Sequence, residues 1–141
     1  KRQVEYGRSE IIRKGKKIAV LGVGSMIPSC MEICKGLKDD GYDPTFVNAR
    51  FVKPLDVDLL DELAKDHSLF VTVEENVKSG GYGEHVSAYM EACHPEAHVL
   101  SATVWDRFVP QGNVESLRAK IGLGVADIRQ AIEDSEVLKE Q

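Results

Sequence analysis

The sequence has little of what marks the specialised classes of protein. Its 141 residues include 3 cysteines, 1 tryptophan and 5 prolines, and 18 Lys and Arg stand against 23 Asp and Glu. The charges are well mixed and form no basic stripe, which argues against nucleic-acid binding. The apolar runs have strand length and fall short of the ~20 residues that cross a bilayer. We therefore expect a globular domain with no nucleic-acid or membrane partner.

The cysteines and histidines form no metal or disulfide pattern. Cys30 and Cys34 lie four residues apart, Cys93 is distant, and no CxxC pair is present. An odd number of cysteines without such a pair argues against a disulfide framework and against structural zinc. Because free cysteine packs as a small hydrophobic residue, we expect buried thiols in a reducing, cytoplasmic setting. The four histidines also lack ligand spacing, and they are His67, His85, His94 and His98.

The length fits one domain, and the hydrophobic pattern predicts its class. Four β-branched runs recur at roughly the length of a βαβ unit. These runs are Ile18–Val23, Thr45–Val52, Leu69–Val73 and His98–Val104. Stretches with the helical period lie between and after them. Their apolar positions are Ile27, Cys30, Met31, Cys34 and Leu37; Leu59, Leu60, Leu63 and Ala64; Val86, Tyr89, Met90 and Cys93; Leu117 and Ile121; and Val125, Ile128 and Ile132.

The first and last residues complete this picture. Ser9–Arg13 is predicted to be an edge strand, joined to Ile18–Val23 as an antiparallel hairpin by the short Lys14–Lys16 turn. The fold class is α/β, a three-layer α/β/α arrangement with a mostly parallel sheet of about five strands. We expect a connector at residues 1–8, one domain at 9–138 and a tail at 139–141. The connector indicates a domain cut from a longer polypeptide or, alternatively, a processed protein.

A glycine-rich turn follows the first long strand. Gly22 and Gly24 stand between this strand and a helix, which is the context of a dinucleotide-binding motif. That motif needs a third glycine, where Ile27 stands, and Pro28 follows in the first turn of the helix. A tight strand-to-helix turn is favoured, and an anion or nucleotide site is the alternative.

Charges and glycines gather after the other strands, where the carboxyl ends of a parallel sheet share one edge. Arg50 is predicted to pair with Glu74, Glu75 or Asp106; clamping a phosphate or carboxylate is the alternative. Because neighbours on a strand point to opposite faces, Glu74 and Glu75 cannot easily share one proton. We predict a protein interface here, with no catalytic, cofactor-binding or metal-binding residue. The interface candidates are Arg50, Glu74, Glu75, Gly80, Gly81, His85, Asp106 and Arg107.

Four strings in this order carry a family resemblance: Gly22–Ser25, Arg50–Asp56, Val73–Asn76 with Gly80-Gly81, and Asp106–Gly112. Together they resemble the C-terminal domain of 1-deoxy-D-xylulose-5-phosphate synthases, in the transketolase superfamily. The resemblance runs from about Gly7 to Ile132. Two positions depart from that family's pattern, Asn48 where Asp is usual and Trp105 where Pro is usual.

The resemblance implies a homodimeric parent transferase that uses thiamine diphosphate and a divalent ion such as Mg²⁺. Such enzymes join pyruvate to glyceraldehyde 3-phosphate and release carbon dioxide; the product feeds isoprenoid, thiamine and pyridoxal synthesis. Their cofactor and activating Glu belong to the two preceding domains, so the resemblance carries no catalytic residue into this chain. It implies a domain that braces the preceding domains and a second copy. The alternatives are the equivalent domain of a transketolase or 2-oxo acid dehydrogenase β subunit, or a free-standing anion-binding or nucleotide-binding module.

Overall fold

The computed structural model describes residues 8–50, 55–75, 81–104 and 125–135. The strands form one sheet in the order β1-β3-β2-β4-β5, and they are β1 (Glu10–Arg13), β2 (Lys17–Gly22), β3 (Thr45–Asn48), β4 (His67–Glu75) and β5 (His98–Val104). A 3₁₀ turn at Gly24–Met26 precedes the first helix. The helices are α1 (Ile27–Asp39), α2 (Val57–Leu63), α3 (Tyr82–Cys93) and α5 (Val125–Glu133).

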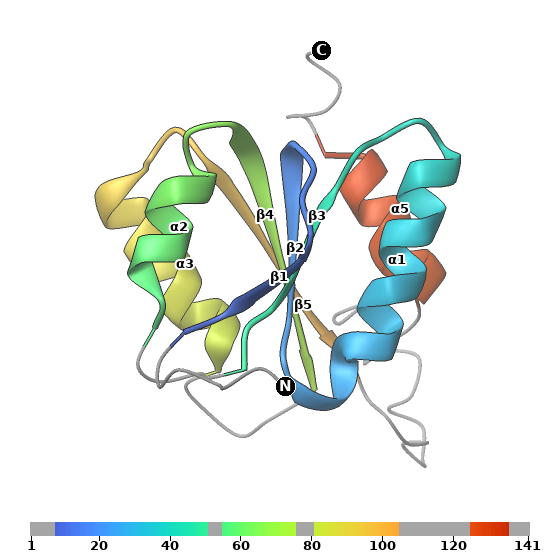
Figure 1. Ribbon diagram of the computed structural model, residues 1–141, viewed down its shortest axis with the longest axis horizontal. Coiled ribbons are helices and arrows are strands. Elements are labelled where there is room, and N and C mark those ends of the chain that lie inside the picture. The colour runs from blue at the N-terminus through green and yellow to red at the C-terminus, as the bar shows by residue number, and fades with distance from the viewer. Residues whose placement is uncertain (1–7, 51–54, 76–80, 105–124, 136–141) are drawn as a thin grey trace, which may run out of the picture.

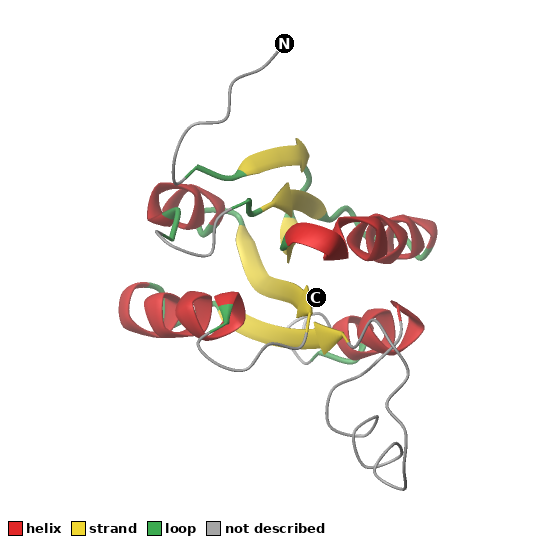
Figure 2. Ribbon diagram, turned by 90° about the horizontal axis from the view of Figure 1, so that it is seen from below, coloured by secondary structure: helices red, strands yellow, loops and turns green. Residues whose placement is uncertain are grey.

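Helices cover both faces of the sheet (Figure 1). Helices α1 and α5 lie on one face and α2 and α3 on the other, with the strands between the two pairs (Figure 2). Strands β2, β3, β4 and β5 are parallel, and among the described strands only β1 runs antiparallel. The predicted three-layer α/β/α class is therefore confirmed. None of the described helices is long and apolar enough to cross a membrane.

The core consists of two clusters separated by the sheet. Alternate residues of β2 enter different clusters: Val20 packs toward α1 and α5, whereas Leu21 packs toward α2 and α3. Both side chains are fully buried. A strand covered on both faces is apolar at every position, which explains why the sequence shows a continuous run here.

Two predicted members of the apolar helix stripes are exposed. Met31 has an exposed fraction of 59%, because the buried stripe of α1 runs through Cys30, Ile33 and Leu37 and leaves Met31 at its margin. Cys93 is exposed at the last residue of α3. The predicted apolar stripe of the last helix is confirmed at Ile128 and Ile132, which are both buried. The expected helix around residues 113–121 lies outside the described residues.

The predicted hairpin between the first two strands is wrong. Strand β1 pairs with β3, because both edges of β2 are taken by the parallel strands β3 and β4. The connection crosses over Asp43 and Pro44, with the Gly15 N–H donating to Thr45 Oγ1 at 2.8 Å. A Cβ at Gly15 would lie 2.1 Å from the Asp43 carbonyl oxygen, so this crossing requires glycine.

The strand predicted at Thr45–Val52 is shorter than expected. Strand β3 ends at Asn48, and Arg50 has a φ of 61°, in the left-handed region, which differs from the extended conformation of a regular strand. The Arg50 N–H donates to Asn48 Oδ1 at 3.0 Å, which stabilises the turn. Val52 lies outside the described residues.

Candidate functional site at the carboxyl edge of the sheet

The predicted interface residues follow the carboxyl ends of the parallel strands. The structure places Arg50 after β3, Glu74 and Glu75 at the end of β4, and Gly81 and His85 around the start of α3. Gly80, Asp106 and Arg107 lie outside the described residues. Strands β2, β3 and β4 pair in parallel, so these residues come to one edge as predicted.

Glu74 caps helix α3. The N–H of Tyr82 donates to one carboxylate oxygen and the N–H of Gly83 to the other, each at 2.8 Å. The first N–H groups of a helix have no partner within the helix, and a carboxylate also favours the positive end of the helix dipole. Glu74 therefore occupies the position that an external anion would need at this helix.

The glycines of this loop make room for that carboxylate. A Cβ at Gly81 would lie 2.5 Å from Glu74 Oε1, and a Cβ at Gly83 would lie 2.9 Å from Glu74 Oε2 and 2.8 Å from Thr72 Oγ1. The glycine pattern that suggested a contact loop thus has an internal use at these two positions. The carboxylate and the two glycines are all visible in the sequence. Their proximity in space could not be predicted, because a loop separates them along the chain.

Arg50 pairs with a different partner from the one predicted. Its Nη2 lies 2.6 Å from Glu10 Oε1 on the edge strand β1. The expected partners Glu74 and Glu75 belong to β4, and β2 separates that strand from β3. The third expected partner, Asp106, lies outside the described residues. The ion pair therefore fastens β1 to the end of β3.

Asp56 is a further junction at this edge, outside the predicted interface residues. Its Oδ1 accepts from the Leu59 N–H at 3.2 Å and caps α2, and its Oδ2 accepts from the Ser9 N–H at 2.7 Å.

Burial, followed by the nearby carboxylates of Asp56 and Glu74, raises the pKa of the Tyr82 hydroxyl. Tyr82 consequently stays neutral beneath the edge and supplies no catalytic base.

The space beside the glycine turn after β2 is occupied by a side chain of the same domain. A Cβ at Gly22 would lie 2.6 Å from Cys30 Sγ, and Gly24 has a φ of 56°. The predicted tight turn is confirmed, since β2 passes through a 3₁₀ turn into α1 with Pro28 in the first turn. Burial, reinforced by Cys34, raises the pKa of Cys30 to about 12. Burial also raises the pKa of Cys34 to about 12, so neither thiol is a ready nucleophile.

The histidines have different environments. His67 is buried, with Nε2 2.6 Å from Thr45 Oγ1 and Nδ1 2.9 Å from the Leu63 carbonyl oxygen. A carbonyl only accepts, so Nδ1 carries the proton and this histidine links β3, β4 and α2. His85 Nε2 is buried without a hydrogen-bond partner among the described residues. His85 therefore remains the candidate of the edge with unused hydrogen-bonding capacity.

The described residues do not fit a thiamine-diphosphate site. They contain no group of three or more His, Cys, Asp or Glu that could hold a metal ion. The N–H groups at the start of α3 already bind Glu74, and the close approach at Gly22 is filled by Cys30.

The chain matches the family "Transketolase, C-terminal domain" over residues 7–128. This match covers most of the sequence. The structure agrees with it, since the described strands form a three-layer domain with one antiparallel edge strand. The chain belongs to the transketolase C-terminal domain family.

The relatives sharpen this placement. The chain is 40% identical over 130 residues to the 1-deoxy-D-xylulose-5-phosphate synthase of Dictyoglomus thermophilum, which covers 92% of this chain and 21% of that protein. The corresponding synthase of Lachnoclostridium phytofermentans is 39% identical over 129 residues, or 91% of this chain and 21% of that protein. The chain thus spans about a fifth of the length of these curated relatives. The resemblance carried by the four strings is confirmed.

Solved structures agree with the fold. A split-gene transketolase, solved as an inactive beta4 tetramer, superposes with a TM-score of 0.77 at 29% identity and covers 97% of this chain and 44% of that one. The transketolase of Campylobacter jejuni gives a TM-score of 0.58 at 16% identity over 92% of this chain and 19% of that one, and shows the shared fold.

Proposed function

We propose that this chain is the C-terminal assembly domain of a thiamine-diphosphate-dependent 1-deoxy-D-xylulose-5-phosphate synthase. The parent would join pyruvate to glyceraldehyde 3-phosphate with loss of carbon dioxide, supplying isoprenoid and thiamine synthesis. It would be a cytoplasmic homodimer that binds its cofactor and Mg²⁺ in the preceding domains. The observation that carries the proposal is the identity of about 40% to such synthases across 92% of this chain.

The internal use of the polar groups supports a role without catalysis. Glu74 caps α3, Arg50 pairs with Glu10, and both thiols of α1 have a raised pKa. The remaining candidates, Glu75 and His85, would contact the preceding domains or the second copy. Reversing the charge with Glu75→Lys in the parent is expected to weaken its dimer in sedimentation. An unchanged association constant would remove Glu75 from the interface.

The central test compares this chain with its parent. Calorimetric titration of the 141-residue chain with thiamine diphosphate and Mg²⁺ is expected to show no binding, and the chain alone should release no carbon dioxide from pyruvate. The parent should bind the cofactor and form the sugar phosphate. Tight cofactor binding by the chain alone would overturn the assembly role.

The structural likeness at 29% identity favours one second candidate, the same domain of a transketolase. The parent would then transfer a two-carbon unit from a ketose phosphate and would not decarboxylate pyruvate. Assaying the parent with each donor separates the two functions. With either function, this chain would have the same role as an assembly domain.

A further inference from the structure

The polypeptide that leads into β1 enters the domain at the carboxyl edge of the sheet. Strand β1 runs antiparallel to β3, and its first residue, Glu10, stands opposite Asn48 at the end of β3. The start of β1 therefore lies beside the carboxyl ends of the parallel strands. Helices α2 and α3 also begin at this edge, because each of them follows a parallel strand along the chain.

A buried carboxylate fastens the entering chain to this edge. The side chain of Asp56 is 8% exposed, and its Oδ2 accepts from the Ser9 N–H at 2.7 Å. Its Oδ1 accepts from Arg8 Nη1 at 3.2 Å, and the same nitrogen lies 3.0 Å from Asp58 Oδ2. The Ser9 hydroxyl donates to the Ala49 carbonyl oxygen at 3.0 Å. These contacts tie the entering chain to the end of β3 and the start of α2, and we call them the entry joint.

The entry joint has a physical reason to persist in the folded domain. Of the three described hydrogen-bond donors to Asp56, two belong to Arg8 and Ser9. A buried carboxylate that loses its donors is costly, whereas an exposed ion pair such as that of Arg8 with Asp58 contributes little. The buried contact of Ser9 is therefore the firm point of the joint. The polypeptide before residue 8 starts from a defined position at the carboxyl edge.

The starts of α2 and α3 form one surface around the joint. The two helices lie side by side on one face of the sheet (Figures 1 and 2), and the Tyr89 hydroxyl of α3 donates to Asp61 Oδ1 of α2 at 2.7 Å. Tyr82, the first residue of α3, lies close to the joint, since burial and then the charge of Asp56 raise the pKa of its hydroxyl. Polypeptide that leaves the joint therefore emerges beside the first turns of both helices.

We propose that the preceding domain of the same chain packs on the first turns of α2 and α3, with the entry joint fixing its position. The packing rests on the proposed function in one respect, that this domain continues a longer polypeptide. It decides between the two partners which that function leaves open, the preceding domains and a second copy. The match covers 21% of the Dictyoglomus thermophilum synthase, so most of such a chain is available for this contact.

Connectivity favours the same chain over a second copy as the occupant. A short connection at Ser9 gives the preceding polypeptide a high effective concentration at this surface. A second copy has no such tether, and it would have to reach the same helix starts past the polypeptide that is already anchored there.

Photo-crosslinking in the full-length parent tests the occupant. A benzoylphenylalanine in place of Glu84, which is exposed in the first turn of α3, is expected to crosslink to a peptide upstream of residue 8 of the same chain. Glu91 is exposed about two turns later on the same side of α3 and is the matched control, which should not capture that peptide. Dimers assembled from one isotope-labelled and one unlabelled chain distinguish capture within a chain from capture between copies.

Two crosslinking results would overturn the proposal: capture of a peptide from the second copy, and equal yields of the upstream peptide from both positions. Thiol labelling of the native parent guards against a silent crosslinker. A bulky maleimide is expected to modify Glu84→Cys severalfold more slowly than Glu91→Cys, as measured by peptide mass spectrometry, and equal rates would contradict the packing. A parent that gives the expected crosslink but forms no 1-deoxy-D-xylulose 5-phosphate would refute the proposed function and leave the packing valid.

Discussion

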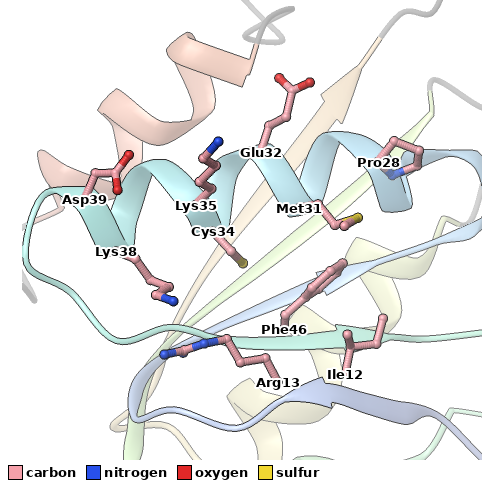
Figure 3. A pocket seen from close by; sticks show the side chains of 10 residues that line it. All are labelled: Ile12, Arg13, Pro28, Met31, Glu32, Cys34, Lys35, Lys38, Asp39 and Phe46. Atoms are coloured by element: carbon pink, nitrogen blue, oxygen red, sulfur yellow. The ribbon is translucent and has the colours of Figure 1, made fainter.

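The carboxyl edge of the sheet and the groove between α1 and β1 differ in how their side chains are used. Residues that line this α1–β1 groove include Ile12, Arg13, Met31, Cys34, Lys38 and Phe46 (Figure 3). At the edge, carboxylates and cations bind groups of the same domain, as Glu74 does with α3 and Arg50 with Glu10. In the groove, apolar side chains such as Met31 remain exposed and Lys38 has no ion pair within the described residues. The charged groups of the edge are therefore used within the domain, whereas apolar side chains of the groove are left exposed.

The reactivity of the thiols tests this contrast with the largest expected effect. Cys34 borders the groove, yet a pKa of about 12 leaves roughly a thousandfold less thiolate at pH 8 than an ordinary thiol has. Because burial raises this pKa, reactivity appears only as the pH rises toward it. Iodoacetamide at pH 8 should modify exposed Cys93 and spare Cys30 and Cys34, as measured by peptide mass spectrometry. Rapid modification of Cys34 in the folded chain would show that the groove opens into the core.

The cap of α3 should carry the largest stability contribution of the edge. Glu74→Ala removes a carboxylate that accepts two backbone hydrogen bonds and is expected to lower the free energy of unfolding by about 2 kcal/mol. Urea denaturation followed by circular dichroism measures the change. Glu75→Ala is the matched control, with an expected change within about 0.5 kcal/mol. Equal losses from both variants would contradict the assignment of the cap.

Arg50 separates an ion pair from a backbone constraint. Both Arg50→Ala and Arg50→Gly remove the pair with Glu10, but only glycine adopts a φ of 61° without strain. The glycine variant should therefore unfold with a free energy about 0.5–1 kcal/mol higher than the alanine variant. Thermal and urea denaturation compare the two. A more stable alanine variant would mean that the turn after β3 has another conformation in solution.

The groove should show the smallest effect in this chain. Met31→Lys is expected to change the free energy of unfolding by less than about 0.5 kcal/mol, because its side chain is 59% exposed. Leu37→Ala, at a fully buried position of the same helix, should cost about 2–5 kcal/mol under the same denaturation conditions. A large loss from Met31→Lys would place its side chain in the core and remove the basis of the groove.

Periodicity in the sequence predicted most of the fold. The continuous apolar run of β2 predicted a strand covered on both faces, and the stripe through Cys30 and Leu37 predicted the inner face of α1. Periodicity could not predict the strand with which β1 pairs. A short turn favours a hairpin locally, but competition among strands for the two edges of β2 decides the pairing, and that competition is a property of the whole sheet.

The site was predictable in location but not in detail. The strand ends indicated the correct edge, whereas the partners of Glu74 and Arg50 depend on the order of strands and on a loop that links distant residues. Periodicity also cannot show which margin of a stripe is left uncovered. Met31 satisfies the helical spacing as well as Cys34 does, yet it lies at the margin of the buried stripe of α1 and is 59% exposed.

The contact between Gly22 and Cys30 has a consequence for how the chain tolerates change. The 2.6 Å between a Cβ at position 22 and the sulfur at position 30 leaves space for only one of the two groups. Scanning single substitutions would score glycine 22 as irreplaceable, yet alanine there combined with a smaller residue at position 30 should recover much of the loss. Tolerance at these two positions is thus a joint property, visible only in libraries that vary both together.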